Sequence, residues 1–369
     1  MAEDCFPFEH FLSGLVRFLD AMKYHDNIFT REERVGRLKH VYKATAKHFD
    51  MPLVQKTWNM SIQRFDGMLQ TITRVTVYCW AHIPREAMVA VNIYFVCIIL
   101  LDDSGSDPML EMGSFWDDLL HQREQKHPFW RFMNDPLKGL LAHYDSFCAI
   151  TIMRSTLDYF QGCWVESRGF KGYPGSYSFP CFLRRLNGLG GVSGATLFPA
   201  VDFDQNKHFE AMATVIAQLE PQVTFVNDLM SFYKETRNPR DGVNLVTNYC
   251  RVDGVTLEGA LDRVIDDSIL ACDGLLTLFN RGCEGHNAQV NTTVRDFVHG
   301  YVTWHLCDPR YEFHDLYERV TAIGISSGKD KDLIAKFCQY YEHATEVGGI
   351  DPKEWVVPLV DIPTIQEQS

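Results

Sequence analysis

Residues 88–107 read MVAVNIYFVCIILLDDSGSD, an apolar run that ends in a group of acidic residues. The run from Met88 to Leu101 has 14 residues and is interrupted by Asn92. A membrane-spanning helix needs about 20 apolar residues, so this run is too short and indicates a helix buried in a protein core. The stretch therefore predicts a core helix that carries carboxylates at its C-terminal end.

The acidic group consists of Asp102, Asp103 and Asp107. Asp103 and Asp107 are four residues apart and share a face as long as the helix lasts, although Pro108 disfavours helical geometry at Asp107. Carboxylates at a helix C-terminus are unfavourable by about 0.3–1 kcal/mol, because that end carries partial negative charge. A bound cation would neutralise the cluster. The alternative is a solvated acidic helix end that leads into a loop.

Apolar residues recur at helical spacing along much of the rest of the chain. Thr30 to Glu33 (TREE) form a capping box, which predicts a helix that starts there. Alternating β-branched runs with tight turns are nearly absent, so we expect an all-α fold. The further candidate helices are 60–81, 86–103, 145–166, 205–235, 256–280, 287–307 and 330–346.

The organisation indicates one domain over residues 1–369, with an irregular tail from about 348. A length of 369 residues would allow two domains at roughly 150 residues each. However, the breaks are short and none resembles an interdomain linker. The expected loops are HPFW at 127–130, GFKGYPGSYSFP at 169–180 and TRNPRDG at 236–242.

Composition and charge exclude several classes of protein. Hydrophobic residues make up 46% and charged residues 22%, which is typical of a globular protein. The formal net charge of −13 argues against a nucleic-acid partner. The eleven cysteines form no CxxC pair and no zinc-ligand spacing. With no signal peptide visible, we expect reduced cysteines, a cytoplasmic location and no stable membrane insertion.

A glycine cluster, GLGGVSG at 188–194, does not complete a dinucleotide-binding motif. The pattern GxGxxG requires glycine at position 193, where Ser193 stands, and no strand is expected before it. Four glycines in a helical context cost about 1 kcal/mol each. Their clustering predicts either a helix break that lets the backbone approach a substrate or a place where two helices pack closely.

A second polar motif lies at 226–235, VNDLMSFYKE. Asn227, Ser231 and Glu235 are spaced at i, i+4 and i+8, so all three lie on one face of a helix. Amide, hydroxyl and carboxylate oxygens are hard ligands that suit Mg²⁺, which is often shared with substrate phosphates. Lys234 could reach the same phosphates. The alternative is an ordinary amphipathic helix, but the spacing beside an Asp-Asp motif favours a metal site.

Together, the two motifs make the chain similar to the class I terpene cyclases, and it resembles the trichodiene synthase family of fungal sesquiterpene cyclases. The resemblance spans nearly the whole chain. It implies a single class I terpenoid synthase helical domain with a central active-site cavity, the use of three Mg²⁺ ions, farnesyl diphosphate as substrate and a homodimer. It rests on LDDS (101–104), IMRSTLDYFQGCWVE (152–166), FLRRLNGLG (182–190), VNDLMSFYKE (226–235) and HGYVTWHLCDPRY (299–311).

The resemblance also implies roles for individual residues. Asp102 matches the first metal-binding aspartate of the aspartate-rich motif. Asn227, Ser231 and Glu235 match the family's second metal-binding motif. The residues expected to contact diphosphate are Arg184, Lys234, Arg310 and Tyr311. One departure concerns the family pattern DDxxD, which would place aspartate at 106, where this chain has Ser106. We therefore expect a trichodiene-like or a longiborneol-like product, which is a hydrocarbon or an alcohol.

Aromatic side chains are expected to stabilise cations in the pocket, by about 0.5–2 kcal/mol each. Phe95 lies seven residues before Asp102, so both lie near one helix face, with Phe95 ~10 Å deeper. The other candidates are Phe160, Trp164 and Trp304. For each of them, plain core packing is the alternative.

Two other functions compete with a lyase that cyclises farnesyl diphosphate. A chain-elongating prenyltransferase usually has two aspartate-rich motifs, whereas the second motif here is of the Asn-Ser-Glu type. A non-catalytic helical diphosphate-binding protein would not need intact ligands at both motifs.

Overall fold

The computed structural model describes residues 6–104, 115–126, 128–237, 244–279, 287–327 and 331–359, without the side chains of 102–104, 116, 128 and 324–327. The described residues form helices and no strand, which confirms the all-α prediction. Two 3-10 turns cover Pro309–Tyr311 (η3) and Pro352–Glu354 (η4). The helices are α1 (Phe8–Ala21), α2 (Arg31–Ala46), α3 (Met51–Trp58), α4 (Ile62–Cys79), α5 (Arg85–Ser104), α6 (Phe115–Leu120), α7 (Pro128–Leu141), α8 (Ser146–Ser167), α9 (Phe179–Asn187), α10 (Gly190–Ala195), α11 (Gln205–Arg237), α12 (Leu245–Asp253), α13 (Leu257–Thr277), α14 (Ala288–Cys307), α15 (Phe313–Ser327) and α16 (Lys331–Gly348).

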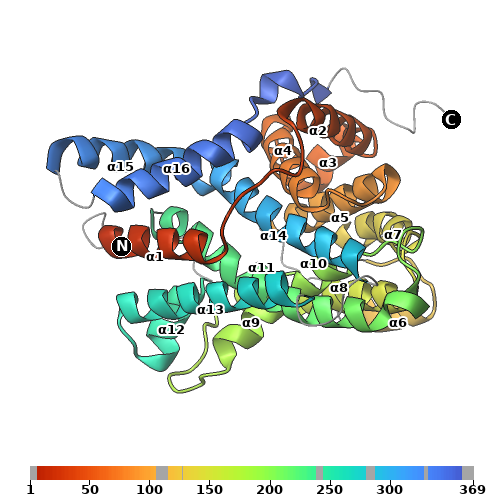
Figure 1. The fold of residues 1–369 in the computed structure, drawn as a ribbon. Coiled ribbons are helices and arrows are strands. Elements are labelled where there is room, and N and C mark those ends of the chain that lie inside the picture. The colour runs from red at the N-terminus through yellow and green to blue at the C-terminus, as the bar shows by residue number, and fades with distance from the viewer. Residues whose placement is uncertain are drawn as a thin grey trace.

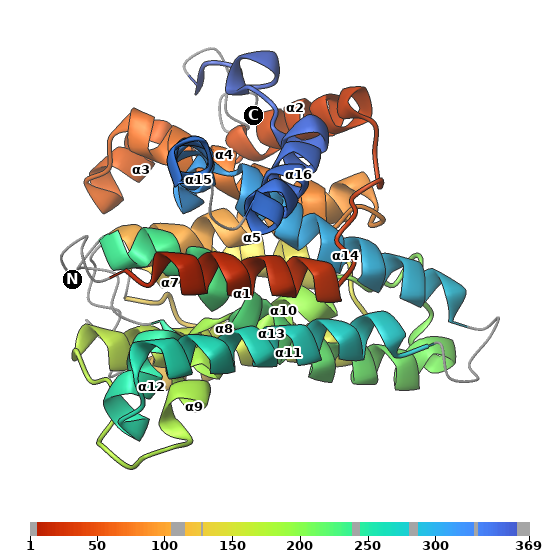
Figure 2. The same ribbon diagram turned by 60° about the vertical axis from the view of Figure 1, so that its left-hand side comes forward.

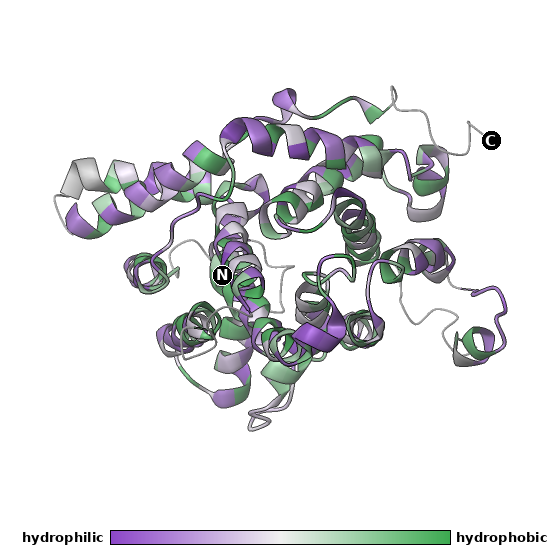
Figure 3. Ribbon diagram, turned by 45° about the vertical axis from the view of Figure 1, so that its right-hand side comes forward, coloured by the Kyte–Doolittle hydropathy of each residue, from purple (hydrophilic) through white to green (hydrophobic). Residues whose placement is uncertain are grey.

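Helix α14 runs between two groups of helices (Figures 1 and 2). It contacts α4 on one side and α11 and α13 on the other. Helix α11, of 33 residues, packs in turn against α10 and α13. The largest continuous hydrophobic stretches lie in the interior, while the outer helices alternate between hydrophobic and hydrophilic residues (Figure 3). Within the described residues, no helix combines the length and apolarity needed to cross a membrane.

Helix α5 is the buried helix that the sequence predicts. Its side chains Val91, Val96 and Leu100 are fully buried. The polar interruption at Asn92 is also buried, and its Nδ2 donates hydrogen bonds to Thr45 Oγ1 (2.8 Å) and Thr73 Oγ1 (3.2 Å). A buried amide without partners would be costly. The two threonines satisfy the donor side of Asn92, whereas its Oδ1 has no hydrogen-bond partner among the described residues.

The expected start of a helix at Thr30 is confirmed. The Thr30 hydroxyl accepts a hydrogen bond from the Glu33 N–H (3.3 Å), and Glu33 Oε2 accepts one from the Thr30 N–H (2.9 Å). Two N–H groups that would otherwise lack partners at the helix start are thereby satisfied.

The prediction of a loop at 127–130 is wrong, because α7 begins at Pro128. A proline lacks only an N–H that the first helical turn leaves unpaired, so it can begin a helix as well as end one. The loop expected at 169–180 ends two residues early, where α9 begins at Phe179. Helix α11 extends through Arg237, and the remainder of the loop expected at 236–242 lies outside the described residues.

Candidate active site

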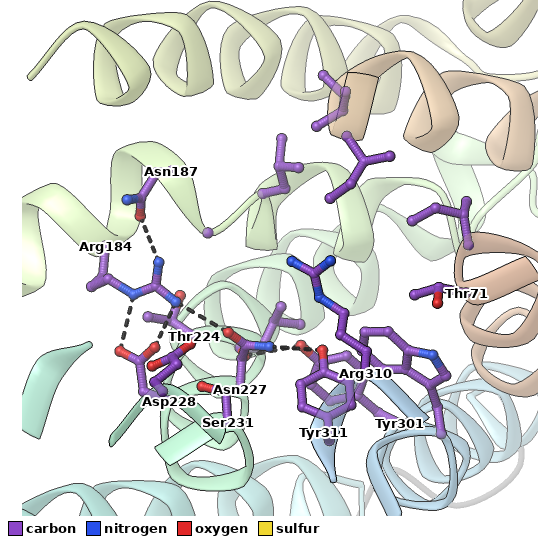
Figure 4. A pocket seen from close by; sticks show the side chains of 18 of the residues that line it. Thr71, Arg184, Asn187, Thr224, Asn227, Asp228, Ser231, Tyr301, Arg310 and Tyr311 are labelled. Atoms are coloured by element: carbon purple, nitrogen blue, oxygen red, sulfur yellow. Dashed lines mark hydrogen bonds and ion pairs between the residues drawn. The ribbon is translucent and has the colours of Figure 1, made fainter. Parts of the chain in front are cut away.

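A cavity of about 470 Å³ lies where α4, α5, α8, α9, α11, α14 and η3 converge. Most of the sequence-predicted site residues line this one cavity (Figure 4). Its wall consists of Thr71, Ile72, Ile98, Ile99, Tyr159, Glu166, Arg184, Asn187, Gly188, Leu189, Val223, Thr224, Asn227, Asp228, Ser231, Lys234, Glu235, Tyr301, Trp304, Arg310 and Tyr311.

Helix α11 brings Asn227, Ser231 and Glu235 to the cavity wall, as the four-residue spacing predicts. The Ser231 side chain is buried, and its Oγ has no hydrogen-bond partner in the structure. A buried hydroxyl without a partner is unfavourable by about 1–3 kcal/mol. This hydroxyl oxygen lies between an amide and a carboxylate on one helix face, and oxygen ligands of these kinds suit a hard cation.

The aspartate-rich motif lies at the C-terminal end of α5. Ile98 and Ile99, about one turn earlier on that helix, line the cavity. The Asp102 side chain lies outside the described part of the structure, and so do Ser106 and Asp107 entirely. The backbone thus brings the end of α5 close to the cavity, and the ligand role of Asp102 stays a prediction.

Arg184 points from α9 toward α11 and forms a buried ion pair with Asp228 (Figure 4). Its Nη2 donates to Asp228 Oδ1 (2.6 Å) and its Nε donates to Asp228 Oδ2 (2.9 Å). Nη1 donates to Asn187 Oδ1 (3.0 Å), and Nη2 also reaches Asn227 Oδ1 (3.3 Å). The guanidinium therefore contacts the amide oxygen that is predicted to bind metal.

The charges of this pair influence one another. Burial raises the pKa of Asp228 to about 6, against the opposing charge of Arg184 and with the added effect of Glu235. Burial by itself would lower the pKa of Arg184, but Asp228 and Glu235 raise it above its ordinary value. Sequence reasoning missed Asp228, although its position directly after Asn227 placed it beside the metal motif.

The other end of the Asn227 amide is held by η3 and α14. Asn227 Nδ2 donates to the Tyr311 hydroxyl (3.3 Å) and lies 3.3 Å from His305 Nε2. His305 Nδ1 donates to the Tyr301 carbonyl oxygen (2.7 Å), which leaves Nε2 as the acceptor of a neutral ring. Burial lowers the pKa of His305 to about 3 and keeps it neutral. Asn227 Oδ1 is thereby directed toward Arg184.

Asp308 places the Arg310–Tyr311 turn against α4. Its Oδ1 accepts hydrogen bonds from the Arg310 backbone N–H (3.0 Å) and the Thr71 hydroxyl (3.2 Å). Its Oδ2 accepts one from Arg74 Nη1 (3.3 Å). Since Thr71 itself lines the cavity, this capping carboxylate positions Arg310 at the wall.

The glycine cluster contains both a helix break and a close helix–helix contact, and the approach of its backbone to a substrate stays a prediction. Leu189, between α9 and α10, has φ +53°, so the helix is broken there, and Gly188 lines the cavity. A Cβ at Gly190 would lie 2.4 Å from the Glu220 carbonyl oxygen of α11. The break and the close packing of α10 on α11 therefore occur together.

Only one of the four predicted pocket aromatics is among the lining residues of this cavity. Trp304 lines it, together with Tyr159 and Tyr301, which the sequence analysis did not select. Phe95 packs on Trp80, with ring centroids 5.3 Å apart. Phe160 stacks on Trp130 at 4.0 Å, and Trp164 is 41% exposed. Tyr301 could have been noticed as the residue one helical turn before Trp304.

Comparison with known proteins gives a consistent result. Residues 5–368 match the family described as trichodiene synthase. The chain is 45% identical over 357 residues to "Terpene cyclase pbrA" of Penicillium brasilianum, with 96% of this chain and 85% of that protein covered. It is 41% identical over 355 residues to "Trichodiene synthase" of Fusarium acaciae-mearnsii, with 96% and 92% covered.

A solved structure resembles the chain in fold. The linalool/nerolidol synthase of Streptomyces clavuligerus, in complex with 2-fluorogeranyl diphosphate, superposes with a TM-score of 0.53 at 16% identity. The match covers 72% of this chain and 94% of that chain. At this identity the likeness concerns the fold alone, and it agrees with the class I terpene synthase architecture expected from the sequence.

Proposed function

The chain belongs to the trichodiene synthase family, and from that premise we propose that its cavity binds farnesyl diphosphate. The protein is a sesquiterpene cyclase, an enzyme that cyclises its substrate through carbocations. The observation that carries the proposal is the convergence of Asn227, Ser231 and Glu235 on one cavity with Arg184 and the Arg310–Tyr311 turn.

The residues at one end of the cavity suit magnesium. The orphaned Ser231 hydroxyl and the oxygens of Asn227 and Glu235 would hold one ion. By family resemblance, Asp102 would hold others, for a total of three. Bound Mg²⁺ supplies Lewis-acid stabilisation of the negative charge that the diphosphate leaving group develops.

Three cationic side chains and one neutral phenol at the same end would hold the diphosphate. Arg184, Lys234, Arg310 and Tyr311 all line the cavity, and charge-assisted hydrogen bonds from such donors are about twice as strong as neutral ones. Arg184 Nη2 donates a hydrogen bond to Asn227 Oδ1 (3.3 Å). Coordination of a cation by that oxygen would compete with this contact and favour a shift of the guanidinium toward the substrate.

The remainder of the wall suits an isoprenoid chain. Ile72, Ile98, Ile99 and Val223 offer only hydrocarbon surface. Trp304 and Tyr301 place aromatic rings at the wall, where their faces would stabilise cationic carbon by about 0.5–2 kcal/mol each. An apolar wall also excludes water from reactive cations. The product that we propose is trichodiene-like or longiborneol-like.

Incubation of the full chain with farnesyl diphosphate and Mg²⁺, followed by gas chromatography–mass spectrometry, tests the proposal. We expect a sesquiterpene hydrocarbon or alcohol, and its loss in Asp102→Ala and Glu235→Ala variants that still fold. Addition of isopentenyl diphosphate separates the first alternative, because a prenyltransferase would then form a longer diphosphate. Diphosphate binding without any turnover would instead identify a non-catalytic binding protein.

A further inference from the structure

Asn244 immediately precedes α12, and its buried side chain reaches back to α11. Its Oδ1 accepts a hydrogen bond from the Val246 N–H (2.8 Å). Its Nδ2 donates two hydrogen bonds, to the Asp228 carbonyl oxygen (2.8 Å) and to Glu235 Oε2 (2.8 Å). Both amide hydrogens and the amide oxygen are therefore engaged.

The orientation of this amide is determined by its partners. The Val246 N–H can only donate, so the amide atom that faces it must be oxygen. The amide nitrogen then faces the Asp228 carbonyl and the Glu235 carboxylate, both of which can only accept. A flipped amide would lose all three hydrogen bonds. The N-cap of α12 thus compels the donor side of Asn244 to point at Glu235.

The following residue strengthens the attachment. The Leu245 N–H donates to Asp228 Oδ2 (3.0 Å), the same oxygen that accepts from Arg184 Nε (2.9 Å). The start of α12 is therefore attached to α11 at Asp228 and at Glu235, seven residues and about 10 Å apart along the helix axis. Asn244 Nδ2, the donor that faces Glu235, is therefore held in place by several hydrogen bonds and does not rotate freely.

We propose that Asn244 is a positioning residue for the metal site, which holds the Glu235 carboxylate by Oε2 and leaves Oε1 to meet a cation. The inference rests on the proposed function, since it requires Glu235 to be a metal ligand. Glutamate has three rotatable side-chain bonds, and a hydrogen bond from a buried amide restricts them before a cation arrives. Loss of such a partner of a ligating carboxylate typically weakens metal affinity by 10–100-fold.

Asn244→Ser separates positioning from capping. Serine is also a good N-cap, but its side chain is too short to reach both the N-cap partner and Glu235. We would titrate Mn²⁺ into the full chain with inorganic diphosphate, and follow free Mn²⁺ by electron paramagnetic resonance. The expected result is a melting temperature close to that of the wild type and Mn²⁺ binding weakened by about 10-fold.

A control variant and a double-mutant comparison make the result decisive. Thr256→Ala removes a comparable N-cap, that of α13, where Thr256 Oγ1 accepts from the Gly259 N–H (3.1 Å), and it should leave Mn²⁺ binding unchanged. In a Glu235→Gln background, Asn244→Ser should weaken Mn²⁺ binding less than it does in the wild type, because the effects of substitutions at two contacting residues are not additive. Asn244→Thr, which also keeps a capping hydroxyl, replaces the serine variant if the latter does not fold.

The outcomes distinguish this proposal from the proposed function. If Asn244→Ser binds Mn²⁺ within twofold of the wild type while Glu235→Ala loses it, the positioning role of Asn244 is overturned and the metal motif stands. If Glu235→Ala binds Mn²⁺ as the wild type does, the metal assignment itself fails, and the role of Asn244 fails with it.

Discussion

Arg184 Nη2 lies 2.6 Å from Asp228 Oδ1, so the arginine expected to bind diphosphate already has a buried carboxylate partner. Both side chains are largely shielded from solvent, and a second hydrogen bond from Nε completes a bidentate contact. A buried charge that loses its partner is strongly unfavourable. A diphosphate that competed with Asp228 for this guanidinium would therefore have to offer it acceptor oxygens in place of the carboxylate.

Replacement of Arg184 by lysine should lower kcat/KM for farnesyl diphosphate by at least 10-fold and broaden the product mixture. A lysine cannot reproduce the planar fork that contacts Asp228 and would contact diphosphate. Arg185→Lys is the matched control, because Arg185 is exposed and lies 4.0 Å from Asp158. Steady-state kinetics with product analysis checks both variants, and an equal loss in the control would shift the assignment to Arg185.

Ser231→Ala should have opposite effects on the metal-free and the metal-bound protein. Its Oγ is buried and has no hydrogen-bond partner among the residues that the structure describes. Removal of this oxygen should therefore leave the stability in EDTA unchanged or raise it by up to about 1 kcal/mol. The additional stabilisation that Mg²⁺ and diphosphate give should shrink. Thermal melting with and without these ligands measures both effects. A variant that is destabilised in EDTA would show that the hydroxyl has a structural partner.

Gly190→Ala should destabilise the fold by about 3 kcal/mol or more, at the upper end of the cost of overpacking. The new Cβ would lie 2.4 Å from a backbone oxygen of α11, which cannot move aside as a side chain could. Gly139→Ala lies inside α7, and apart from its own helix backbone no atom of the described residues lies within 4 Å of the new Cβ. This variant should instead stabilise the fold by about 0.4–1 kcal/mol. Urea denaturation of the two variants tests the contrast, and equal effects would contradict it.

Trp304→Leu should change the product distribution toward less cyclised products. Trp304 lines the cavity, and leucine preserves apolar burial but removes the ring that stabilises cations. Trp164→Leu is the matched control at a tryptophan that is 41% exposed, and its products should equal those of the wild type. Gas chromatography–mass spectrometry of the products formed by both variants measures these distributions. An altered product profile in the control alone would place the cation-stabilising ring on α8.

Acidification should destabilise the protein through His343. Its Nε2 accepts a hydrogen bond from the Asp26 N–H (3.1 Å), which requires an unprotonated nitrogen. Burial lowers the pKa of His343, and the neighbouring His25 lowers it further. Because the folded-state pKa lies below the unfolded value of about 6.5, this stability is present above that pH and is lost as the pH falls below it.

Melting temperatures from pH 7.5 to 5.5 test this linkage. His343→Gln keeps an acceptor that does not titrate, so its melting temperature should fall less than that of the wild type over this range. Burial also lowers the pKa of His299, so part of the loss should persist in the variant. Identical pH slopes in the two proteins would assign the whole effect to other groups.

The amino-acid sequence determined those features that depend on local periodicity. The spacing of Asn227, Ser231 and Glu235 placed them on one face of α11, because a helix repeats every 3.6 residues. The apolar run before Asp102 gave a buried helix, and the Thr30–Glu33 capping box gave a helix start. Each of these inferences needs only residues within a few turns of one another.

Only the tertiary structure decided which side chains from different helices meet. The pairing of Arg184 with Asp228 joins residues 44 positions apart. It depends on the orientation of α9, which ends just before the break at Leu189. The choice of Trp304 rather than Phe95 for the cavity wall depends on the rotation and crossing of α14 and α5. An aromatic residue satisfies the hydrophobic pattern equally well in the core or at the cavity, so its sequence position cannot distinguish the two, whereas the packing of neighbouring helices does.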